Sequence, residues 1–331
     1  MPRLRSARVT TVKSSLIARI ADGLHRPGER FLSTRAVAQR FGISFQTAHR
    51  VISELQAEGY LQRRPSSGTY IAGLKKSLRQ AELWFHPRAR REGSYGAHLL
   101  HQLLAELRRK GISHRVCWPE ASARPAENSY PVIWELAEVL DWARTRRQRA
   151  LLLNDIPAPG LAANLIDAVT TDDYSAGICA AQALQPRPSG RGCYVAVAGP
   201  AVDRRSRRRI EGFCSGIPRA RVVSAGGWYF EDGLRVAKRV LAFRPDAVFC
   251  VNDRLAEALL AYCREHHLAA PRVVGHDNAP VAETCHLTTI ATPWEEMVAT
   301  AGELIRSRLE DYAGTASHVT LAQQLVRRLS A

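Results

Sequence analysis

Three short polar side chains each stand at the end of a buried-type apolar run. Asn154 ends the segment RALLLN, Asn252 ends DAVFCVN, and Asp277 ends PRVVGHD. Runs of this kind are typical of parallel strands, and ligands bind outside the carboxyl ends of such strands. The sequence therefore predicts that these amide and carboxylate groups line a ligand site.

Three further residues are expected at the same site. Arg209 lies on the helix predicted after GCYVAVAGP, and Trp228 and Trp294 offer flat apolar faces. Guanidinium, amide and carboxylate groups beside aromatic rings suit the hydroxyls and CH faces of a sugar. Structural alternatives stay open: Asp277 as a helix cap, Asn252 as the support of its own turn, and each tryptophan as core.

The elements that must position these residues alternate between strands and helices. Eight segments resemble buried strands: 81–86, 114–118, 131–135, 149–154, 192–199, 221–226, 246–253 and 271–277. Helical patterns fall at 95–111, 135–147, 174–185, 204–215, 231–243 and 254–267. Alternation of this kind predicts parallel sheets. Over about 250 residues it predicts an α/β region of two Rossmann-like lobes with a cleft between them.

The stretch FGISFQTAHRVISELQAEGYLQRRPSSGTYI, residues 41–71, carries a second kind of chemistry. Ser44 is a suitable N-cap for a helix whose buried stripe is predicted to contain Ala48, Val51, Ile52 and Leu55. That stripe turns Phe45, Gln46, His49 and Arg50 outward. Helices predicted from Val12 and from Ser33 precede it, and two short strands follow it, so a winged helix-turn-helix (α+β) is predicted.

The outward side chains suit the major groove of double-stranded DNA. Gln46 can bond adenine in a bidentate manner, and Arg50 can bond guanine or phosphate. Arg64 and Gly68 lie in the predicted wing, where contacts with the backbone or minor groove are expected. The net charge of the chain is +16, and residues 1–80 carry 15 Lys or Arg against 4 Asp or Glu. This concentration of charge favours a polyanion partner.

Residues 27–71, PGERFLSTRAVAQRFGISFQTAHRVISELQAEGYLQRRPSSGTYI, resemble the DNA-binding domain of the GntR family. The resemblance implies that Ser33 and Arg35 hold phosphates. It also implies that Ser44, Gln46 and Thr47 open the recognition helix and that Gly68 forms the wing. Phe45 stands where the family often has Arg, so no operator sequence is inferred.

Residues 80–330 resemble the periplasmic-binding-protein-like (type I) effector domain of the LacI/GalR regulators. The resemblance rests on the motifs DDYSAG (172–177), RRIEGF (208–213), DAVFCVND (246–253), VVGHDN (273–278) and LTTIATPWEEMVATAG (287–302), and on the closing LAQQLVRRLS. It implies an effector, often a sugar, at the positions of Asn154, Arg209, Asn252 and Asp277. It further implies a homodimer with contacts along the lobes.

The sequence contains none of the signatures of several other protein classes. No run of 18 apolar residues and no secretory signal is present, so a cytoplasmic protein with no membrane contact is expected. The seven cysteines are widely spaced without C-x-x-C, which indicates reduced thiols. No hydrolase, nucleotide or metalloprotease motif occurs, so neither catalysis nor a cofactor or metal is expected.

The predicted organisation is a DNA-binding domain over residues 1–72, a linker over 73–80 and an effector-binding, dimerising domain over 81–331. The predicted function is regulation of transcription at a double-stranded DNA operator, by repression as the family default, under control of a sugar or sugar derivative. A regulator that responds to no effector, or to one other than a sugar, is the alternative.

Overall fold

The computed structural model describes residues 2–21, 28–57, 60–72, 78–119, 123–146, 148–155, 157, 165–185, 192–312 and 315–331. By its contacts the chain forms two compact units. Unit 1 comprises Met1–Arg88, Leu103–Val169 and Ala299–His318, and unit 2 comprises Ala89–Gln102, Thr170–Val298 and Val319–Ala331.

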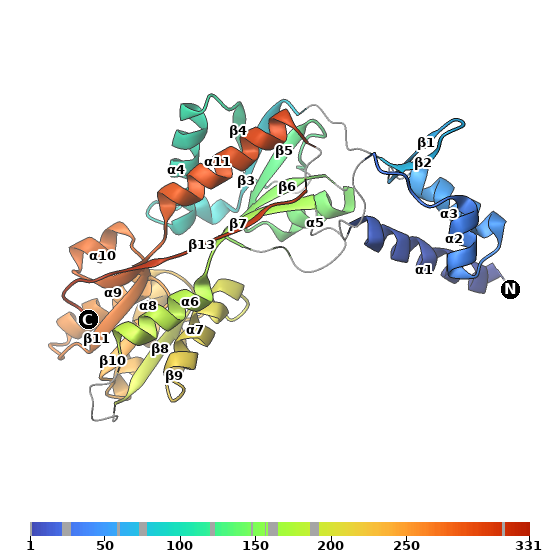
Figure 1. Ribbon diagram of the computed structural model, residues 1–331. Helices are drawn as coiled ribbons and strands as arrows, with labels where there is room; N and C mark the ends of the chain where they lie inside the picture. Colours follow the sequence, from blue (N-terminus) through green and yellow to red (C-terminus); the bar gives the residue numbers. More distant parts are fainter. Residues whose placement is uncertain are drawn as a thin grey trace. The chain divides into compact units, whose positions relative to one another are not determined.

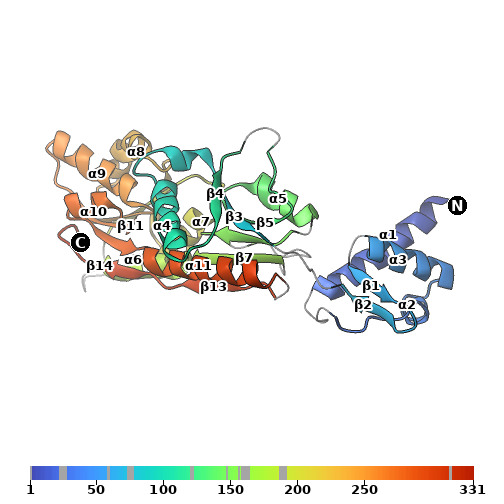
Figure 2. The same ribbon diagram turned by 90° about the horizontal axis from the view of Figure 1, so that it is seen from above.

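The N-terminal part of unit 1 is the predicted winged helix-turn-helix (Figure 2). Its elements are α1 (Pro2–Ala21), α2 (Thr34–Phe41), α3 (Phe45–Ala57), β1 (Leu61–Arg64) and β2 (Gly68–Ile71). The two strands pair antiparallel from Leu61 opposite Ile71 to Arg64 opposite Gly68. The predicted stripe of α3 is confirmed, because Ala48, Val51, Ile52 and Leu55 are all buried in a core of this domain's own side chains.

Capping residues mark where these helices begin and end. The Ser33 hydroxyl accepts a hydrogen bond from the Ala36 amide (3.1 Å), and the Ser44 hydroxyl accepts one from the Thr47 amide (3.2 Å). Gly42 ends α2 in the left-handed conformation, with φ at 59°, which glycine adopts without strain.

The helical pattern predicted from Val12 onward is confirmed as far as Ala21, and α1 begins earlier, at Pro2. Val9 shares the buried face of Val12 and Leu16, so the apolar period continues further toward the N-terminus than the sequence pattern suggested. Pro27, Gly59 and residues 73–77 of the predicted linker lie outside the described residues, and the domain division at 72–81 stays a prediction.

The rest of unit 1 is a parallel α/β layer (Figure 1). Its sheet has the order β13-β7-β6-β5-β3-β4. The strands are β3 (Gln80–Phe85), β4 (His114–Cys117), β5 (Ser129–Trp134), β6 (Ala150–Leu153), β7 (Ile166–Thr171) and β13 (His318–Leu321). The helical elements η1 (Pro87–Arg90), α4 (Tyr95–Arg109) and α5 (Ala137–Arg146) come between them along the chain. The predicted strands 81–86, 114–118, 131–135 and 149–154 are confirmed.

Unit 2 has its own six-stranded sheet in the order β14-β12-β11-β10-β8-β9. The strands are β8 (Tyr194–Ala198), β9 (Arg221–Ser224), β10 (Ala247–Cys250), β11 (Arg272–Asp277), β12 (Thr288–Ala291) and β14 (Gln324–Val326). The helices are α6 (Asp173–Ala183), α7 (Arg204–Gly216), α8 (Phe230–Ala242), α9 (Asp253–Glu265) and α10 (Pro280–Thr284). The helix α11 (Trp294–Glu310) begins in unit 2 and belongs to unit 1 from Ala299 onward. All strand pairs are parallel except β12 with β14. The predicted α/β class with two parallel sheets is thus confirmed.

Four strands were not predicted, namely β7, β12, β13 and β14. The strand β7 shows the reason, because its sequence IDAVTT contains a charge and two threonines and yet is fully buried. Asp167 accepts two hydrogen bonds from Arg308 (2.9 and 2.8 Å) and one from the Tyr130 hydroxyl (2.6 Å). The buried carboxylate of Asp167 is therefore satisfied by an arginine that is remote in the sequence, and this pairing allows the polar strand β7 to lie in the core.

Two of the sequence motifs meet where α6 crosses α7. A Cβ atom on Gly212 would lie 2.0 Å from the carbonyl oxygen of Tyr174, and one on Gly177 would lie 2.1 Å from that of Arg209. No other residue type fits a backbone approach this close. The glycines in DDYSAG and RRIEGF are therefore required by the helix crossing.

Within the described residues, no helix combines the length and apolarity needed to cross a bilayer. All seven cysteines fall in this part of the chain and are free.

We predict that Gly212→Ala lowers the free energy of unfolding by about 1–3 kcal/mol, because the added methyl group forces α6 and α7 apart. Alanine is otherwise the better helix former, so a loss isolates the crossing as its cause. The measurement is urea unfolding followed by tryptophan fluorescence. Glu211→Ala, at an exposed position of the same helix, is the control. A Gly212→Ala protein as stable as the control would contradict this account.

Candidate functional site

The most concentrated group of buried charges in the described residues surrounds Arg209 in unit 2. The Arg209 Nε donates to Asp173 Oδ1 (2.7 Å), and its Nη1 donates to the carbonyl of Val251 (2.7 Å). The same Nη1 lies 3.6 Å from Asp277 Oδ1. Burial opposes the charge on Arg209, but the two carboxylates raise the pKa of the guanidinium above its ordinary value. Arg209 is therefore a charged group at physiological pH.

Asp277 is held from the other side by a histidine. It ends β11 with φ at 102°, a strained conformation for any residue but glycine, and such strain gathers at functional sites. Its Oδ1 lies 2.8 Å from His276 Nδ1, and His276 Nε2 lies 2.9 Å from Gln323 Nε2. Burial and Arg209 lower the pKa of His276, so the ring is neutral. It donates from Nδ1 to Asp277 and accepts from Gln323.

Three hydroxyl groups in unit 2 are buried without a hydrogen-bond partner among the described residues. They belong to Tyr95, Thr171 and Thr292. Burial and the neighbouring Asp277 raise the pKa of the Tyr95 phenol, which therefore stays protonated. The Thr292 amide donates to the carbonyl of Asp277 (3.4 Å), so its side chain stands beside the same strand end. Buried polar groups are normally satisfied, and those that are not mark a place where a ligand or water belongs.

The two predicted tryptophans lie in unit 2 in different surroundings. The Trp294 ring is 4.5 Å from the Tyr95 ring and 4.5 Å from the His98 ring, measured between centroids. Trp228 lies against Gly199, where an added Cβ would come within 2.9 Å of its ring. Only Trp294 is thus connected, through Tyr95, with the residues around Arg209.

Asn252 serves the backbone in this structure. Its Oδ1 accepts from the Leu255 amide (2.9 Å) and caps α9, and its Nδ2 donates to the carbonyl of Trp228 (2.8 Å). Both polar atoms are engaged, which is the structural alternative considered above. Its role as an effector ligand stays a prediction.

Asn154 belongs to unit 1, apart from the other five predicted residues. It follows β6 with φ at 56°, and both polar atoms of its amide are buried without a partner among the described residues. Of the predicted set, the structure therefore brings Arg209 together with Asp277, and Asn252 together with Trp228.

The sequence analysis missed Asp173, Tyr95, His276 and Gln323. Asp173 stands inside the motif DDYSAG, and His276 inside VVGHDN, so those motifs were the available signal. Gln323 stands inside the closing motif LAQQLVRRLS, whereas nothing near Tyr95 in the sequence indicates that it lies close to Asp277.

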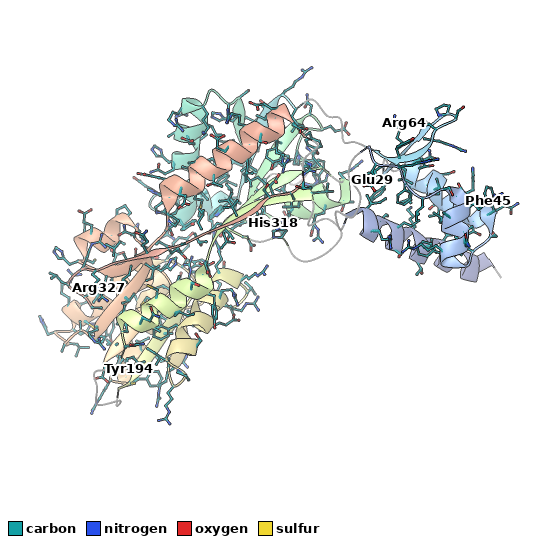
Figure 3. All side chains as sticks on the ribbon, viewed as in Figure 1. Glu29, Phe45, Arg64, Tyr194, His318 and Arg327 are labelled. Carbon is teal, nitrogen blue, oxygen red and sulfur yellow. The ribbon has the colours of Figure 1, made fainter. Side chains whose placement is uncertain are left out.

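The predicted DNA-binding residues lie on the surface of the winged helix. Phe45 is 57% exposed and its side chain projects from α3 (Figure 3). The side chains of Arg35, Gln46, His49 and Arg50 are also exposed, and Thr47 is half-buried. The hydroxyls of Ser33 and Ser44 cap helices, although this leaves each with capacity for a further hydrogen bond.

Two of the exposed arginines are oriented by neighbours. Arg50 Nε donates to Glu54 Oε1 (3.0 Å), and Glu54 also receives Lys13 Nζ (3.2 Å). In the wing, the Arg64 guanidinium lies 4.4 Å from the centre of the Tyr70 ring (Figure 3). Gly68, with φ at 122°, closes the hairpin beside Arg30. Among the described residues, no cluster of three His, Cys, Asp or Glu has the arrangement of a metal site.

Two protein families match separate parts of the chain. Residues 8–71 match the gntR family of bacterial regulatory proteins, and residues 192–331 match the periplasmic binding protein-like domain. The chain therefore joins a GntR-type helix-turn-helix domain to a periplasmic-binding-protein-like domain.

Curated relatives match part of the chain. The chain is 29% identical over 128 residues to the HTH-type transcriptional repressor PurR of Vibrio cholerae, covering 35% of this chain and 38% of that protein. It is 28% identical over 181 residues to PurR of Escherichia fergusonii, covering 51% and 52%. The chain thus spans about half or less of the length of these curated relatives.

Solved structures show the same fold. A LacI family transcriptional regulator from Enterococcus faecalis V583, with bound ribose, superposes with a TM-score of 0.64 at 22% identity, covering 76% of this chain and 98% of that one. The transcriptional regulator CelR in complex with cellobiose gives a TM-score of 0.65 at 16% identity, covering 87% and 92%.

We predict that Arg209→Met lowers the free energy of unfolding by about 3–5 kcal/mol, because it leaves Asp173 and Asp277 buried without their cation. Arg208→Met is the matched control, since the pair of Arg208 with Glu211 is half-exposed and contributes at most about 1 kcal/mol. Chemical unfolding followed by tryptophan fluorescence measures both. Equal losses in the two variants would show that the buried ion pair contributes no more to the free energy of unfolding than the exposed one.

Proposed function

We propose that the protein is a sequence-specific transcriptional regulator, a repressor, that binds a double-stranded DNA operator in the bacterial cytoplasm under control of a small polyhydroxylated effector. The observation that carries the proposal is the joining of two features in one chain. One is an exposed recognition helix in a GntR-type domain, and the other is a buried polar cluster with unsatisfied hydroxyls in a periplasmic-binding-protein-like domain.

The DNA-binding part is supported by the surface of α3. Its apolar stripe is buried, so Phe45, Gln46, His49 and Arg50 are free to enter the major groove with the N-terminal part of the helix first. Arg35 and Arg64 stand on other elements of the same domain and suit phosphate contacts. The matched relatives are named as repressors, which supports the sign of regulation.

The effector part is supported by the donors and acceptors around Arg209. Asp277 and the hydroxyls of Tyr95, Thr171 and Thr292 offer both donors and acceptors, which is what a sugar hydroxyl requires. Trp294 offers an aromatic face beside Tyr95. Two proteins of the same fold were solved with ribose and with cellobiose. We assign Arg209, Asp277 and Trp294 to the effector site, with Asn154, Trp228 and Asn252 as further candidates.

A homodimer completes the proposal. One winged helix reads few base pairs, and two copies on two half-sites supply the specificity that an operator needs. Light scattering at micromolar concentration, with and without DNA, measures the assembly. A monomeric mass in both conditions would contradict the dimer.

We predict that binding to a selected operator weakens steeply as salt rises, because phosphate contacts release counterions. Gln46→Ala should cost about 1–3 kcal/mol on the operator and nearly nothing on random DNA, whereas Arg35→Ala should weaken binding to both alike. Fluorescence anisotropy on an operator obtained by selection from random sequences measures each term. If Gln46→Ala loses equally on both DNAs, direct base reading by this residue is wrong.

We predict that Asp277→Ala abolishes the response of operator binding to the effector while leaving binding without effector within about twofold, since Asp277 lies in unit 2 and the DNA surface does not. A buried polar partner left unpaired weakens binding strongly. The effector is first found by a thermal-shift panel of sugars.

The operator is then titrated with that sugar for the wild type, Asp277→Ala and Asp141→Ala. Asp141 is an exposed carboxylate of α5 and controls for the change of charge. An unchanged response in Asp277→Ala would place the effector elsewhere.

A further inference from the structure

We propose that Asp173 sets the charge of the ligand that unit 2 accepts: by occupying Arg209 it makes the site select uncharged hydroxyl-bearing ligands and reject anionic ones such as sugar phosphates and sugar acids. This inference rests on the proposed function, because it concerns the effector site described above.

Two of the nitrogen donors of Arg209 are already engaged within the protein. An arginine that binds a carboxylate or phosphate ligand presents adjacent N–H groups as a fork. In this protein Nε is already bonded to Asp173 and Nη1 to the Val251 carbonyl, and Asp277 lies 3.6 Å from Nη1. Arg209 is only 3% exposed and Asp173 only 6%. The cation that could attract an anionic ligand is thus bound within the protein.

The buried charges around Arg209 do not cancel. Asp173 and Asp277 contribute two negative charges against the single positive charge of Arg209, and His276 is neutral. The nearby Arg205 bonds Asp203 Oδ2 (2.9 Å), and that pair adds no net charge. The first four groups therefore sum to one net negative charge, and the neighbouring Asp253, whose pKa is raised by burial and by Asp277, adds no positive charge. An anion placed beside it would meet like charge in a buried setting, which is strongly unfavourable.

Three buried hydroxyl groups indicate which class of ligand the proposed site accepts. The hydroxyls of Tyr95, Thr171 and Thr292 have no hydrogen-bond partner among the described residues, and both threonines are 4% exposed. Each hydroxyl can donate one hydrogen bond and accept others. A neutral ligand rich in hydroxyls satisfies these groups and donates to Asp277 without adding charge. The unsatisfied groups and the negative charge therefore favour the same class of ligand.

The test uses inorganic phosphate as the probe and the full chain throughout. The chain's six tryptophans, Trp84, Trp118, Trp134, Trp142, Trp228 and Trp294, all lie outside residues 1–72, so unfolding followed by tryptophan fluorescence does not report on the winged helix. Thermal unfolding of the wild type, Asp173→Asn and Asp141→Asn is compared in phosphate and in chloride at equal ionic strength. Asp141→Asn makes the same change of charge at an exposed position.

We expect phosphate to raise the unfolding temperature of Asp173→Asn over its chloride value by more than it raises that of the wild type or of Asp141→Asn, which gain alike from the general stabilising effect of phosphate. If the wild type gains as much as Asp173→Asn, or if Asp173→Asn gains nothing, the proposal is overturned. Asp173→Ser is a second variant that also removes the carboxylate bonded to Arg209. It should gain from phosphate too, and it keeps the proposal testable if Asp173→Asn does not fold.

A second measurement separates this proposal from the proposed function. Calorimetry on the wild type compares ribose with ribose 5-phosphate and glucose with glucuronate. We expect any sugar that binds to do so at least about tenfold more tightly than its anionic counterpart. An anionic member that binds as well as its neutral counterpart would overturn the charge selection but leave an effector-controlled regulator intact. If no sugar binds while the phosphate result holds, the sugar effector fails and the charge selection stands.

Discussion

The buried ion pair between Arg209 and Asp173 depends on one close contact between helices. The backbones of α6 and α7 approach at Gly177 and Gly212, where a side chain would collide with a carbonyl oxygen. Because the helices touch at this point, a guanidinium on α7 reaches a carboxylate at the first residue of α6 without leaving the core. A wider crossing would admit water between the two charges, and the guanidinium would then be available to other anions.

A buried charge of this kind requires every neighbouring polar group to be satisfied, and the C-terminal segment contributes much of that satisfaction. Gln323 orients His276 and, through it, Asp277. Further along, Arg328 donates to Asn278 Oδ1 (2.9 Å), the residue that follows Asp277. The last ten residues thus fix the strand end that carries Asp277. This accounts for the closing motif LAQQLVRRLS being informative despite its lack of an apolar pattern.

The parts that could be predicted from sequence are those determined by short-range signals. The recognition helix follows from a serine cap and four apolar residues at helical spacing, and eight strands follow from apolar runs. Arg209 and Asp277 were predicted because their strand-linked positions are visible locally. Asp173 and Tyr95 were missed because their significance arises only from partners brought by the fold. Asn252 shows the converse: its position at a strand end is right, but both of its polar atoms bond the backbone, which no local pattern reveals.

In the proposed function, an effector bound in unit 2 changes DNA binding by unit 1, and five chain segments join the two units. The chain changes unit after residues 88, 102, 169, 298 and 318. Tyr95 lies between the first two of these points, Thr171 and Asp173 follow the third, Trp294 precedes the fourth and Gln323 follows the fifth. The residues of the proposed site thus lie close in sequence to each point where the chain changes unit. The proposed effector can shift an equilibrium only by its difference in affinity between two arrangements of the protein. Because the side chains proposed to read DNA lie outside this set, the proposal assigns ligand binding and base reading to separate residues.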